Sequence, residues 1–319
     1  MGGSPIRSHL GTQLPKSTVG GVLSSESVSG KHVLVVGLGR TGLAASRFLK
    51  KKGAHVTVSD SRPPAYFQKL IGGLVSSNIG LEMGQHDESI FCRQDLIVIS
   101  PGVDPRLPVL EAARSRNIPV VSEIEVASWF LSGRIVGITG SNGKTTTTSL
   151  LSKILTASNF SVQAGGNFGT PLISQLESSS EKTLSVVELS SFQLEIIKQF
   201  RPHLAILLNL TEDHLDRHGS FEEYVAAKGN IFKNQGPEDC AVLNADEPLV
   251  MKFVKTLRSR PVLFSRGREL VEGVFIENKK VIYRTGNLER VIISLEDIPL
   301  LGQHNLENVL AAIAAAGSI

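Results

Sequence analysis

The sequence predicts an α/β protein built from two successive parallel-sheet units. Short runs of β-branched and aliphatic residues alternate with amphipathic stretches along most of the chain. Strands that alternate with helices form parallel sheets with both faces covered. Two glycine-rich segments, Gly37–Gly42 and Gly140–Thr145, each follow an apolar run and precede a helical one. The length of 319 residues suits two domains, each large enough for its own core.

Composition divides the chain into a tail and two folded units. Residues 1–29 are rich in Ser and Gly, hold one acidic residue, Glu26, and show no periodicity, so a disordered tail is predicted. The first unit is predicted to cover residues 30–122 and the second residues 123–319, because a new strand–helix series starts soon after Ser122.

The first unit is predicted to be Rossmann-like, with a helix after its first strand. The apolar pattern predicts strands at Val33–Val36, Val56–Ser59, Leu96–Ile99 and Val120–Val121, and helices at Leu43–Lys52 and Leu107–Asn117. Gly53 is placed to end the first helix, because glycine adopts the left-handed conformation of a helix C-terminus without strain.

The second unit is predicted to be an α/β domain of the P-loop ATPase type. Its predicted elements are strands at Ile135–Thr139, Ser185–Glu188, Leu204–Leu208 and Ala241–Leu243, helices at Thr145–Ala157 and Asn305–Ala316, and a hairpin with strands Val274–Glu277 and Val281–Tyr283. Asn278-Lys279-Lys280 forms the turn of that hairpin.

The bulk composition excludes several classes of partner. The formal net charge is +3 with histidine counted as neutral, which is too small an excess to indicate nucleic acid or an anionic membrane. No run reaches the roughly 18 apolar residues that a membrane span needs. The two cysteines, Cys92 and Cys240, lie far apart and in no metal-binding spacing, so we expect buried thiols in a reducing compartment, the cytoplasm.

The segment from Gly140 to Thr146 has the features of a phosphate-binding loop. It follows a β-branched strand and opens a helix, and its glycines let backbone N–H groups approach a phosphate closely. The pattern is the short form Gly-x-x-Gly-Lys-Thr, because Ile138 occupies the position of the first glycine in the longer form. Lys144 is expected on the β- and γ-phosphates and the Thr145 hydroxyl on Mg²⁺. The predicted ATP-binding residues of the loop are Gly140, Ser141, Asn142, Gly143, Lys144, Thr145 and Thr146.

The first glycine loop, Gly37–Gly42, matches Gly-x-Gly-x-x-Gly after a strand. Asp60 ends the next predicted strand about 20 residues further on, where dinucleotide-binding domains place an acid on a ribose diol. NAD is therefore one possible ligand, but any nucleotide diphosphate can use the same helix N-terminus, and a structural turn is a third alternative. Two such loops in one chain favour two different phosphorylated ligands over a dehydrogenase.

Further polar residues follow strands of the second unit. Glu188 ends a strand that should neighbour the loop strand, where a carboxylate suits Mg²⁺. His214 also follows a strand, but its residue type and spacing fit a structural role as well as a functional one. The local pattern alone predicts that Lys228, on an amphipathic helix, is a solvated side chain. Asn305 and Asn308 share a helix face and could contact an adenine edge or cap the helix.

Taken together, these residues resemble the Mur ligases, and among them the branch that adds D-glutamate. The resemblance runs from about residue 28 to the end of the chain. The segments that carry it are Gly37–Gly42, Ser100–Gly102, Gly140–Thr146, Gly165–Gly169, Glu188–Glu195, Thr211–Asp216, Tyr224–Lys228 and His304–Asn308.

The resemblance implies roles for individual residues. Thr145 and Glu188 would hold a first Mg²⁺, and His214 and Lys228 a second, with Lys228 carbamylated so that it becomes a metal-binding carboxylate. Catalysis would rest on Lys144 with Glu188, His214 and Lys228. Asn305 and Asn308 would contact adenine. The residues implied to bind a UDP-linked substrate are Arg40, Thr41, Asp60, Arg62, Ser100, Pro101, Gly102, Asn167, Ser190 and Gln193.

The resemblance also implies a reaction. ATP would phosphorylate the carboxylate of UDP-N-acetylmuramoyl-L-alanine, and the amine of D-glutamate would displace the phosphate to form an amide bond. Members of the family carry a third, C-terminal domain that the sequence to Ile319 does not include. This chain alone is therefore expected to bind the UDP-linked substrate without completing the ligation. The alternatives are a non-catalytic nucleotide-binding fragment and an NAD-dependent oxidoreductase. A cytoplasmic monomer without nucleic-acid or membrane partners is expected.

Overall fold

The computed structural model describes residue 24, residues 28–300 and residues 302–319. The predicted disordered tail therefore lies almost wholly outside the described residues. Within them, Val28 is only 1% exposed and packs into the core beneath the first sheet. Packed structure thus begins before residue 30, where the first unit was predicted to start.

The first unit contains a five-stranded parallel sheet, sheet A, with the order β3-β2-β1-β4-β5. Its strands are β1 (His32–Val36), β2 (His55–Asp60), β3 (Gly80–Met83), β4 (Leu96–Ile99) and β5 (Val120–Ser122). All the predicted strands are present, and the Rossmann-like class is confirmed. The prediction missed β3, whose sequence Gly-Leu-Glu-Met contains no β-branched residue.

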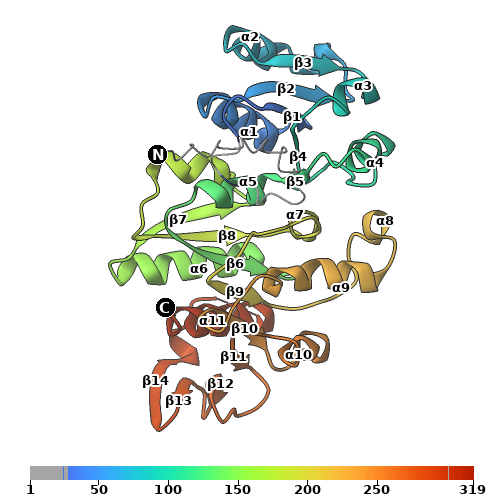
Figure 1. The fold of residues 1–319 in the computed structure, drawn as a ribbon. Helices are drawn as coiled ribbons and strands as arrows, with labels where there is room; N and C mark the ends of the chain where they lie inside the picture. Colours follow the sequence, from blue (N-terminus) through green and yellow to red (C-terminus); the bar gives the residue numbers. More distant parts are fainter. Residues whose placement is uncertain (1–23, 25–27, 301) are drawn as a thin grey trace, which may run out of the picture.

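Helices of the first unit flank sheet A (Figure 1). They are α1 (Arg40–Lys51), α2 (Gln68–Ser76), α3 (Glu88–Phe91) and α4 (Pro108–Ser115), with a 3₁₀ turn η2 (Pro64–Phe67). Helix α1 starts three residues earlier than predicted, because the glycine loop runs directly into it at Gly39. Helix α4 ends before the predicted Asn117, which has a left-handed φ of 61° that a continuing helix does not allow.

The second unit is built on sheet B, which has nine strands in the order β14-β13-β12-β11-β10-β9-β6-β8-β7. They are β6 (Arg134–Thr139), β7 (Ser161–Gly166), β8 (Thr183–Glu188), β9 (Leu204–Leu207), β10 (Cys240–Asn244), β11 (Arg260–Ser265), β12 (Gly273–Glu277), β13 (Lys280–Thr285) and β14 (Leu288–Ser294). The pairs from β7 to β12 are parallel, and β12, β13 and β14 pair antiparallel. The predicted hairpin is confirmed: Asn278 and Lys279 both have positive φ, as a tight hairpin turn requires.

Two long helices, α6 and α11, pack beside each other on sheet B (Figure 1). The helices of this unit are α6 (Lys144–Ala157), α7 (Ser191–Leu194), α8 (Leu215–His218), α9 (Phe221–Gly229), α10 (Pro248–Val254) and α11 (Gln303–Ala316). Three 3₁₀ turns, η3 (Leu172–Ser178), η4 (Asn230–Phe232) and η5 (Leu295–Asp297), complete it. Buried alanines such as Ala311 and Ala315 let α11 approach the sheet closely.

The chain passes from sheet A to sheet B through α5 (Glu123–Phe130), which carries two buried carboxylates. Glu125 accepts hydrogen bonds from the backbone N–H groups of Lys198, Gln199 and Phe200 at 2.8–3.0 Å. Glu123 accepts one from the N–H of Ile173 at 2.7 Å, and its other oxygen is buried with no hydrogen-bond partner among the described residues. Both acids therefore hold segments of the second unit against α5.

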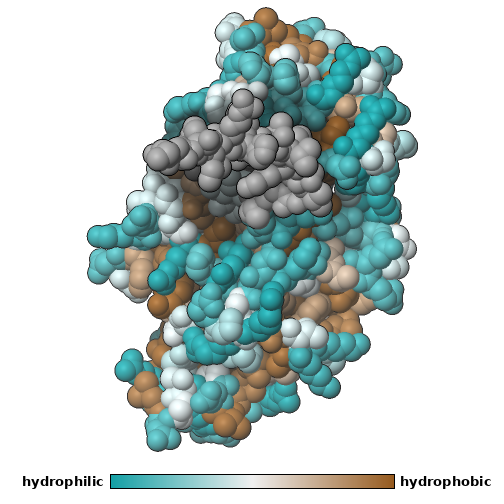
Figure 2. All heavy atoms as spheres, in the orientation of Figure 1, coloured by the Kyte–Doolittle hydropathy of each residue, from teal (hydrophilic) through white to brown (hydrophobic). Residues whose placement is uncertain are grey.

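The surface is mostly hydrophilic in the view of Figure 2, with apolar patches toward both ends of the molecule. Val75 on α2 is 59% exposed at one end, and Val291 on β14 is 58% exposed at the other. Among the described residues no helix is both long and apolar enough to cross a bilayer.

The Glu123 carboxyl gives the fold a pH-dependent component of stability. Burial raises its pKa to about 7, although the Ile173 N–H acts in the opposite direction. The native state then holds this proton more tightly than the unfolded chain, so its stabilising contribution is complete below the unfolded pKa and is lost as pH rises through about 7. In the parent protein this carboxyl should lower the free energy of unfolding by roughly 3 kcal/mol between pH 4.5 and pH 8. In Glu123→Gln we expect the free energy of unfolding, measured with urea, to lose this dependence on pH.

The matched control is Glu181→Gln, which removes an exposed carboxylate. It should keep the pH dependence of the parent protein. An unchanged pH dependence in Glu123→Gln would show that the buried carboxyl titrates as it does in the unfolded chain.

Candidate functional site

The glycine loop between β6 and α6 lies where three parallel strands end. Gly140 and Gly143 have φ values of 154° and 86°, which the backbone of other residues rarely adopts. A Cβ on Gly143 would also overlap the side-chain oxygen of Asn308. Helix α6 starts directly after Gly143, so its N-terminal N–H groups and partial positive charge are presented at the loop.

Lys144 spans this loop. Its Nζ donates hydrogen bonds to the carbonyl oxygens of Gly140 at 2.9 Å and Ser141 at 2.8 Å. Burial lowers the pKa of Lys144, while Glu188 and Asp213 act in the opposite direction. The ammonium group thus sits inside the loop, on the side where an anion bound by the backbone would lie.

Thr145 at the start of α6, Glu188 at the end of β8 and Asn167 just after β7 form a hydrogen-bonded row. The Thr145 hydroxyl donates to Glu188 Oε2 at 2.7 Å, and Asn167 Nδ2 donates to Glu188 Oε1 at 3.2 Å. Glu188 is 4% exposed, and its carbonyl oxygen also accepts from the Asn167 N–H. The strand register explains why these residues lie together, because Glu188 pairs with Ile138 on β6 and with Gly166 on β7.

The chain after β9 is hydrogen-bonded to the glycine loop along its length. Ser141 N donates to Asn209 O at 3.0 Å, and Asn142 N donates to Asn209 Oδ1 at 2.8 Å. Ser141 Oγ donates to the carbonyl of Thr211 at 3.0 Å and lies 2.8 Å from the hydroxyl of Tyr224, which is fully buried on α9. These bonds hold the segment from Asn209 to Thr211 against the loop.

Lys228 on α9 is buried, not solvated as its sequence pattern alone suggests. It is 2% exposed, its Nζ donates to Gly140 O at 2.9 Å, and it lies 4.6 Å from the ring centre of Tyr224. Burial and, after it, the charge of Lys144 lower the pKa of Lys228 to about 7. Lys228 therefore has a large neutral fraction near pH 7, and a neutral amine is a nucleophile.

His214 follows the segment from Asn209 to Thr211 along the chain. It has a left-handed conformation, with φ 52° and ψ 33°, and caps the N-terminus of the short helix α8. Its side chain is 53% exposed and lies 3.5 Å from the carboxylate of Asp213. Its ring packs at 5.1 Å from that of Phe192 on α7. The structure thus brings Lys144, Glu188, Lys228 and the His214 segment around one glycine loop.

The donor atoms at the loop fit magnesium better than a transition metal. Across the residues that the structure describes, no group of three His, Cys, Asp or Glu side chains gathers as a metal cluster. The Thr145 hydroxyl and the Glu188 carboxylate are hard oxygen donors in contact with each other. Mg²⁺ typically uses one or two such protein oxygens and completes its shell with water and substrate phosphates.

The two asparagines predicted to contact adenine, Asn305 and Asn308 on α11, differ in their burial. Asn308 is 4% exposed, accepts from the Thr147 hydroxyl at 3.2 Å, and packs directly behind Gly143. Asn308 Nδ2 lies 3.4 Å from Asn305 Oδ1, and Asn305 is half-buried. Asn308 supports the glycine loop, and Asn305 lies nearer the surface of α11.

A cavity of about 510 Å³ opens at the carboxyl ends of sheet A. It is bordered by the first glycine loop, the Ser100–Gly102 turn and, from sheet B, Asn167. Of the residues that the sequence predicts for a UDP-linked substrate, those lining it are Arg40, Thr41, Asp60, Arg62, Ser100, Pro101, Gly102 and Asn167. Asn167 therefore belongs both to this cavity and to the Glu188 row.

Asp60 lines the cavity with its carboxylate already engaged. Oδ1 accepts from Arg62 N and Nε, and Oδ2 accepts from Arg62 Nη2 and from the Leu38 N–H, all at 2.7–3.0 Å. Burial favours the protonated acid, but the hydrogen bonds from Arg62 and Leu38 outweigh it and lower the pKa of Asp60 to about 2. A carboxylate accepts about four hydrogen bonds, so Asp60 holds the loop and Arg62 rather than offering a vacant acceptor to a ribose diol.

Ser190 and Gln193 do not line that cavity. They form a capping box at the start of α7, in which Gln193 Oε1 accepts from Ser190 N at 3.0 Å and Ser190 Oγ accepts from Gln193 N at 3.3 Å. Gln193 is 2% exposed. The contact of these residues with a substrate stays a prediction, and their observed role is to start the helix.

Sequence reasoning missed several residues at these sites. His86 lines the sheet A cavity, with Nδ1 held 2.8 Å from the buried Ser59 hydroxyl. Tyr224 begins one of the segments that carry the family resemblance but was given no role, yet its hydroxyl lies 2.8 Å from Ser141 Oγ in the glycine loop. Arg217 joins the two units, as described below. Each depends on contacts between distant segments, and no local pattern marks them.

Comparison with known proteins adds an independent line of evidence. Residues 138–316 match the model of the Mur ligase middle domain, and residues 31–122 match that of the MurD-like N-terminal domain of Mur ligases. The chain is 50% identical over 286 residues to the UDP-N-acetylmuramoylalanine–D-glutamate ligase of Koribacter versatilis, covering 90% of this chain and 63% of the relative. The corresponding ligase of Acidobacterium capsulatum is 48% identical over 291 residues, with 91% and 63% covered.

Solved structures agree on the fold. The UDP-N-acetylmuramate:L-alanyl-γ-D-glutamyl-meso-diaminopimelate ligase of Neisseria meningitides superposes with a TM-score of 0.57 at 21% identity, covering 91% of this chain and 94% of that one. The UDP-N-acetylmuramate–alanine ligase of Thermotoga maritima gives 0.51 at 22% identity, with 90% and 65% covered. The chain thus spans about 63% of the length of its curated relatives. Its middle-domain match alone extends over more than half of its residues, and the chain belongs to the Mur ligase family.

Proposed function

We propose that this chain carries the nucleotide-binding part of an ATP-dependent ligase that adds D-glutamate to UDP-N-acetylmuramoyl-L-alanine in peptidoglycan precursor synthesis. The observation that carries the proposal is the meeting of Lys144, Thr145 and Glu188 at one glycine loop. The D-glutamate branch is supported by the MurD-like match of residues 31–122 and by relatives at 45–50% identity with that name. We further propose a cytoplasmic monomer, in keeping with the free thiols of Cys92 and Cys240.

The geometry explains how such a reaction is assisted. A carboxylate is a poor electrophile, and transfer of a phosphoryl group from ATP turns its oxygen into a leaving group. Backbone N–H groups of the loop and Lys144 stabilise the negative charge of the phosphates. Mg²⁺, held by Thr145 and Glu188, would supply further charge neutralisation. Asn305 on α11 is placed near the surface behind the loop, where it would contact the adenine together with Asn308.

The sheet A cavity is assigned to the UDP-linked substrate. Its volume of about 510 Å³ suits a nucleotide, and Arg40 and the start of α1 offer positive charge for a diphosphate. Asn167 extends from this cavity to Glu188, so a substrate that fills the cavity reaches toward the phosphate loop. The engaged carboxylate of Asp60 disfavours NAD, whose ribose diol would need it as an acceptor.

Lys228 is proposed to be carbamylated. Its neutral amine attacks the carbon of CO₂, so that an N–C bond forms while one C=O π bond breaks and its electron pair moves to oxygen. The nitrogen then releases a proton to water, which leaves a carbamate with one negative charge. The lowered pKa of about 7 makes the amine available for this step. The carbamate would replace a cation beside Lys144 with an anion and, together with His214, provide oxygen and nitrogen donors for a second Mg²⁺.

Calorimetric titration of this chain with UDP-N-acetylmuramoyl-L-alanine, and separately with NAD⁺, tests the assignment of the cavity. We expect saturable binding of the UDP-sugar and none of NAD⁺. The reverse result would favour an oxidoreductase.

Release of ADP on addition of ATP and D-glutamate should follow when the chain is extended by the C-terminal part of the Koribacter versatilis relative. Binding of both nucleotides without ADP release from that extended protein would favour a non-catalytic nucleotide-binding module.

Lys144→Ala should remove most of the stabilisation that Mg-ATP gives the chain. The substitution deletes the ammonium group at the phosphates, and charge-assisted contacts of this kind change affinity by about 10- to 100-fold. The measurement is the shift in melting temperature with Mg-ATP. Lys153→Ala, on the same helix α6, is the control and should shift like the parent. An undiminished shift in Lys144→Ala would contradict the assignment of the loop.

Carbamylation of Lys228 has a direct spectroscopic test. Equilibration with ¹³C-labelled CO₂ should produce a carbamate carbon signal that is absent in Lys228→Ala and present in Lys233→Ala, which removes an exposed lysine nearby. At fixed CO₂ the signal should rise as pH increases through about 7, because only the deprotonated amine reacts. A signal that survives in Lys228→Ala would assign the carbamate to another amine.

A further inference from the structure

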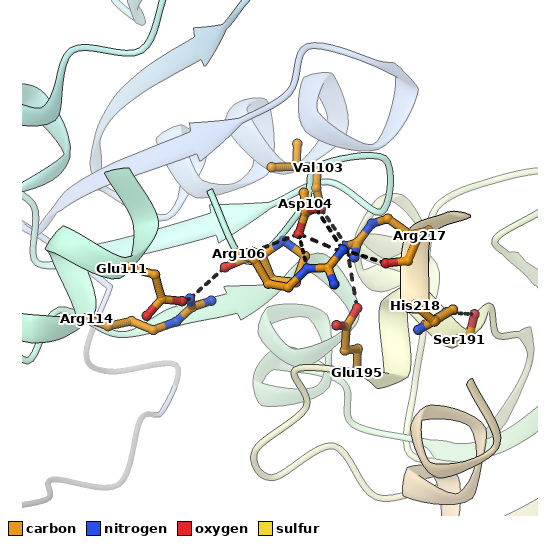
Figure 3. Close-up of polar contacts among 10 residues, drawn as sticks. Val103, Asp104, Arg106, Glu111, Arg114, Ser191, Glu195, Arg217 and His218 are labelled. Carbon is orange, nitrogen blue, oxygen red and sulfur yellow. Dashed lines mark hydrogen bonds and ion pairs between the residues drawn. The ribbon is translucent and has the colours of Figure 1, made fainter. Parts of the chain in front are cut away.

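Arg217 lies between the two units at a place that no local motif marks. It belongs to α8, three residues after His214, and its side chain crosses to the loop that follows β4 (Figure 3). Its side chain is 16% exposed. It is therefore largely enclosed between sheet A and sheet B, unlike most arginines on a short surface helix.

The backbone of Arg217 holds His214. Its N–H donates to the His214 carbonyl at 3.0 Å, and the His218 N–H donates to the same oxygen at 3.1 Å. Helix α8 has only four residues, so these two bonds define the turn that keeps His214 in its left-handed conformation. The backbone positions of Arg217 and His214 are therefore linked directly.

The side chain of Arg217 holds the loop after β4. Nη2 donates to the Val103 carbonyl at 3.3 Å, and Nη1 lies 3.4 Å from Asp104 Oδ1. From the other side, Arg106 Nη2 donates to the Arg217 carbonyl at 2.6 Å. Arg106 also binds the Asp104 carboxylate through Nε and Nη2 (Figure 3). Val103 borders the sheet A cavity, directly after the Ser100–Gly102 turn.

Phe192 on α7 provides a shared platform beneath this bridge. The Arg217 guanidinium lies 5.2 Å from its ring centre, and the rings of His214 and His218 lie 5.1 and 5.2 Å from it. His218 is fixed in turn by a 2.8 Å contact between its Nε2 and the Ser191 hydroxyl (Figure 3). Arg217 and His214 thus pack against the same aromatic ring.

The charges around Arg217 are balanced but loosely paired. Two arginines face Asp104 and Glu195, and the distance from Arg217 Nη2 to Glu195 Oε2 is 3.5 Å. Glu195 Oε2 and Arg217 Nη1 are buried, and neither makes a hydrogen bond within the described part of the chain. Both ion-pair distances exceed the usual length of a charge-assisted hydrogen bond, so a small shift of the loop shortens or breaks them.

We propose that Arg217 is a positioning residue that couples occupancy of the sheet A cavity to the placement of His214 at the phosphate loop. A ligand in the cavity fixes the Val103 loop, the loop holds the Arg217 side chain, and the Arg217 backbone holds His214. The segment from Asn209 to Thr211 continues the connection to the glycine loop. The inference rests on the proposed function only in taking a UDP-sugar and a nucleoside triphosphate as the two ligands.

The test compares three variants of this chain. Arg217→Ala removes the bridge. Arg217→Lys keeps a positive charge but lacks the planar fork that reaches Val103 and Asp104 together. Arg114→Ala is the matched control, because Arg114 donates to Pro105 in the same loop and pairs with Glu111 on α4, but does not cross to sheet B (Figure 3).

The first readout is the affinity of UDP-N-acetylmuramoyl-L-alanine with and without saturating magnesium and a non-hydrolysable ATP analogue. In the parent and in Arg114→Ala we expect the two affinities to differ by about fivefold or more, the lower end of ordinary coupling. In Arg217→Ala the ratio should fall to about one, and in Arg217→Lys to an intermediate value. The UDP-sugar alone should still bind to Arg217→Ala, because the Arg217 side chain is not among the residues that line the cavity.

The second readout is the ring signal of His214 in a ¹H–¹³C spectrum, assigned with His214→Gln. Addition of the UDP-sugar alone should move this signal in the parent and in Arg114→Ala, and leave it in place in Arg217→Ala. A role in stability alone would lower the melting temperature without abolishing either response. Should Arg217→Ala fail to fold, Asp104→Asn weakens the same bridge from the exposed end of the loop and should reduce both responses.

The outcomes separate the inference from the proposed function. A ratio of one in a parent protein that binds both ligands, or a ratio that persists in Arg217→Ala, overturns the coupling and leaves the proposed function standing. A parent protein that binds neither ligand overturns the proposed function, and the inference with it.

Discussion

The parallel register of β6 with β8 and β9 is the constraint on which the candidate site depends. Ile138 on β6 pairs with Glu188 on β8, and Thr139 pairs with Leu207 on β9, so the three strands end at one edge of sheet B. Parallel strands direct their carboxyl ends to the same side, where ligands of α/β proteins bind. A slip by one residue would turn the Glu188 side chain to the other face of the sheet. The hydrogen bond from Thr145 to Glu188 would then be lost.

Charge burial at this edge explains why the site suits an anionic ligand. Lys144 and Lys228 both donate to the Gly140 carbonyl, Lys144 is half-buried and Lys228 is buried, and the charge of Lys144 acts on Lys228. Glu188 and Asp213 offset part of this charge. Groups arranged in this way are costly to bury unless an opposite charge joins them. Phosphate oxygens would provide that charge, which links the electrostatics of the loop to the proposed activity.

The two units are joined by polar contacts of different strength. On one side of the junction, Glu125 of the connecting helix α5 is fully buried and accepts three backbone N–H groups from the segment before β9, which fixes α5 to the second unit. On the other side, Arg217 meets Asp104 and Glu195 at ion-pair distances of 3.4 and 3.5 Å. The coupling proposed for Arg217 lies at the attachment whose ion-pair distances are longer.

Local sequence determined a large part of this protein. Runs such as Leu96–Ile99 form buried strands because their β-branched and aliphatic side chains fit a sheet covered on both faces, and the two glycine loops are readable because only glycine allows their backbone. Family resemblance supplied the candidate roles of Lys228 and His214, which spacing alone left open. Strands β3, β7, β11 and β14 were not predicted. Three of them, β3, β7 and β14, are sheet edges with exposed or half-buried residues, where apolar periodicity is weak.

Only the tertiary structure decided which polar groups are used up inside the protein and which remain for a ligand. Gln193 and Asp60 carry the same functional groups as Asn167 and Glu188, yet a helix cap occupies the first and Arg62 with Leu38 occupies the second. Residue type and spacing describe what a side chain is able to bind. Its actual partners come from segments far away in the chain, as for Arg217 and Val103, and their distance is set by how the two sheets pack against α5.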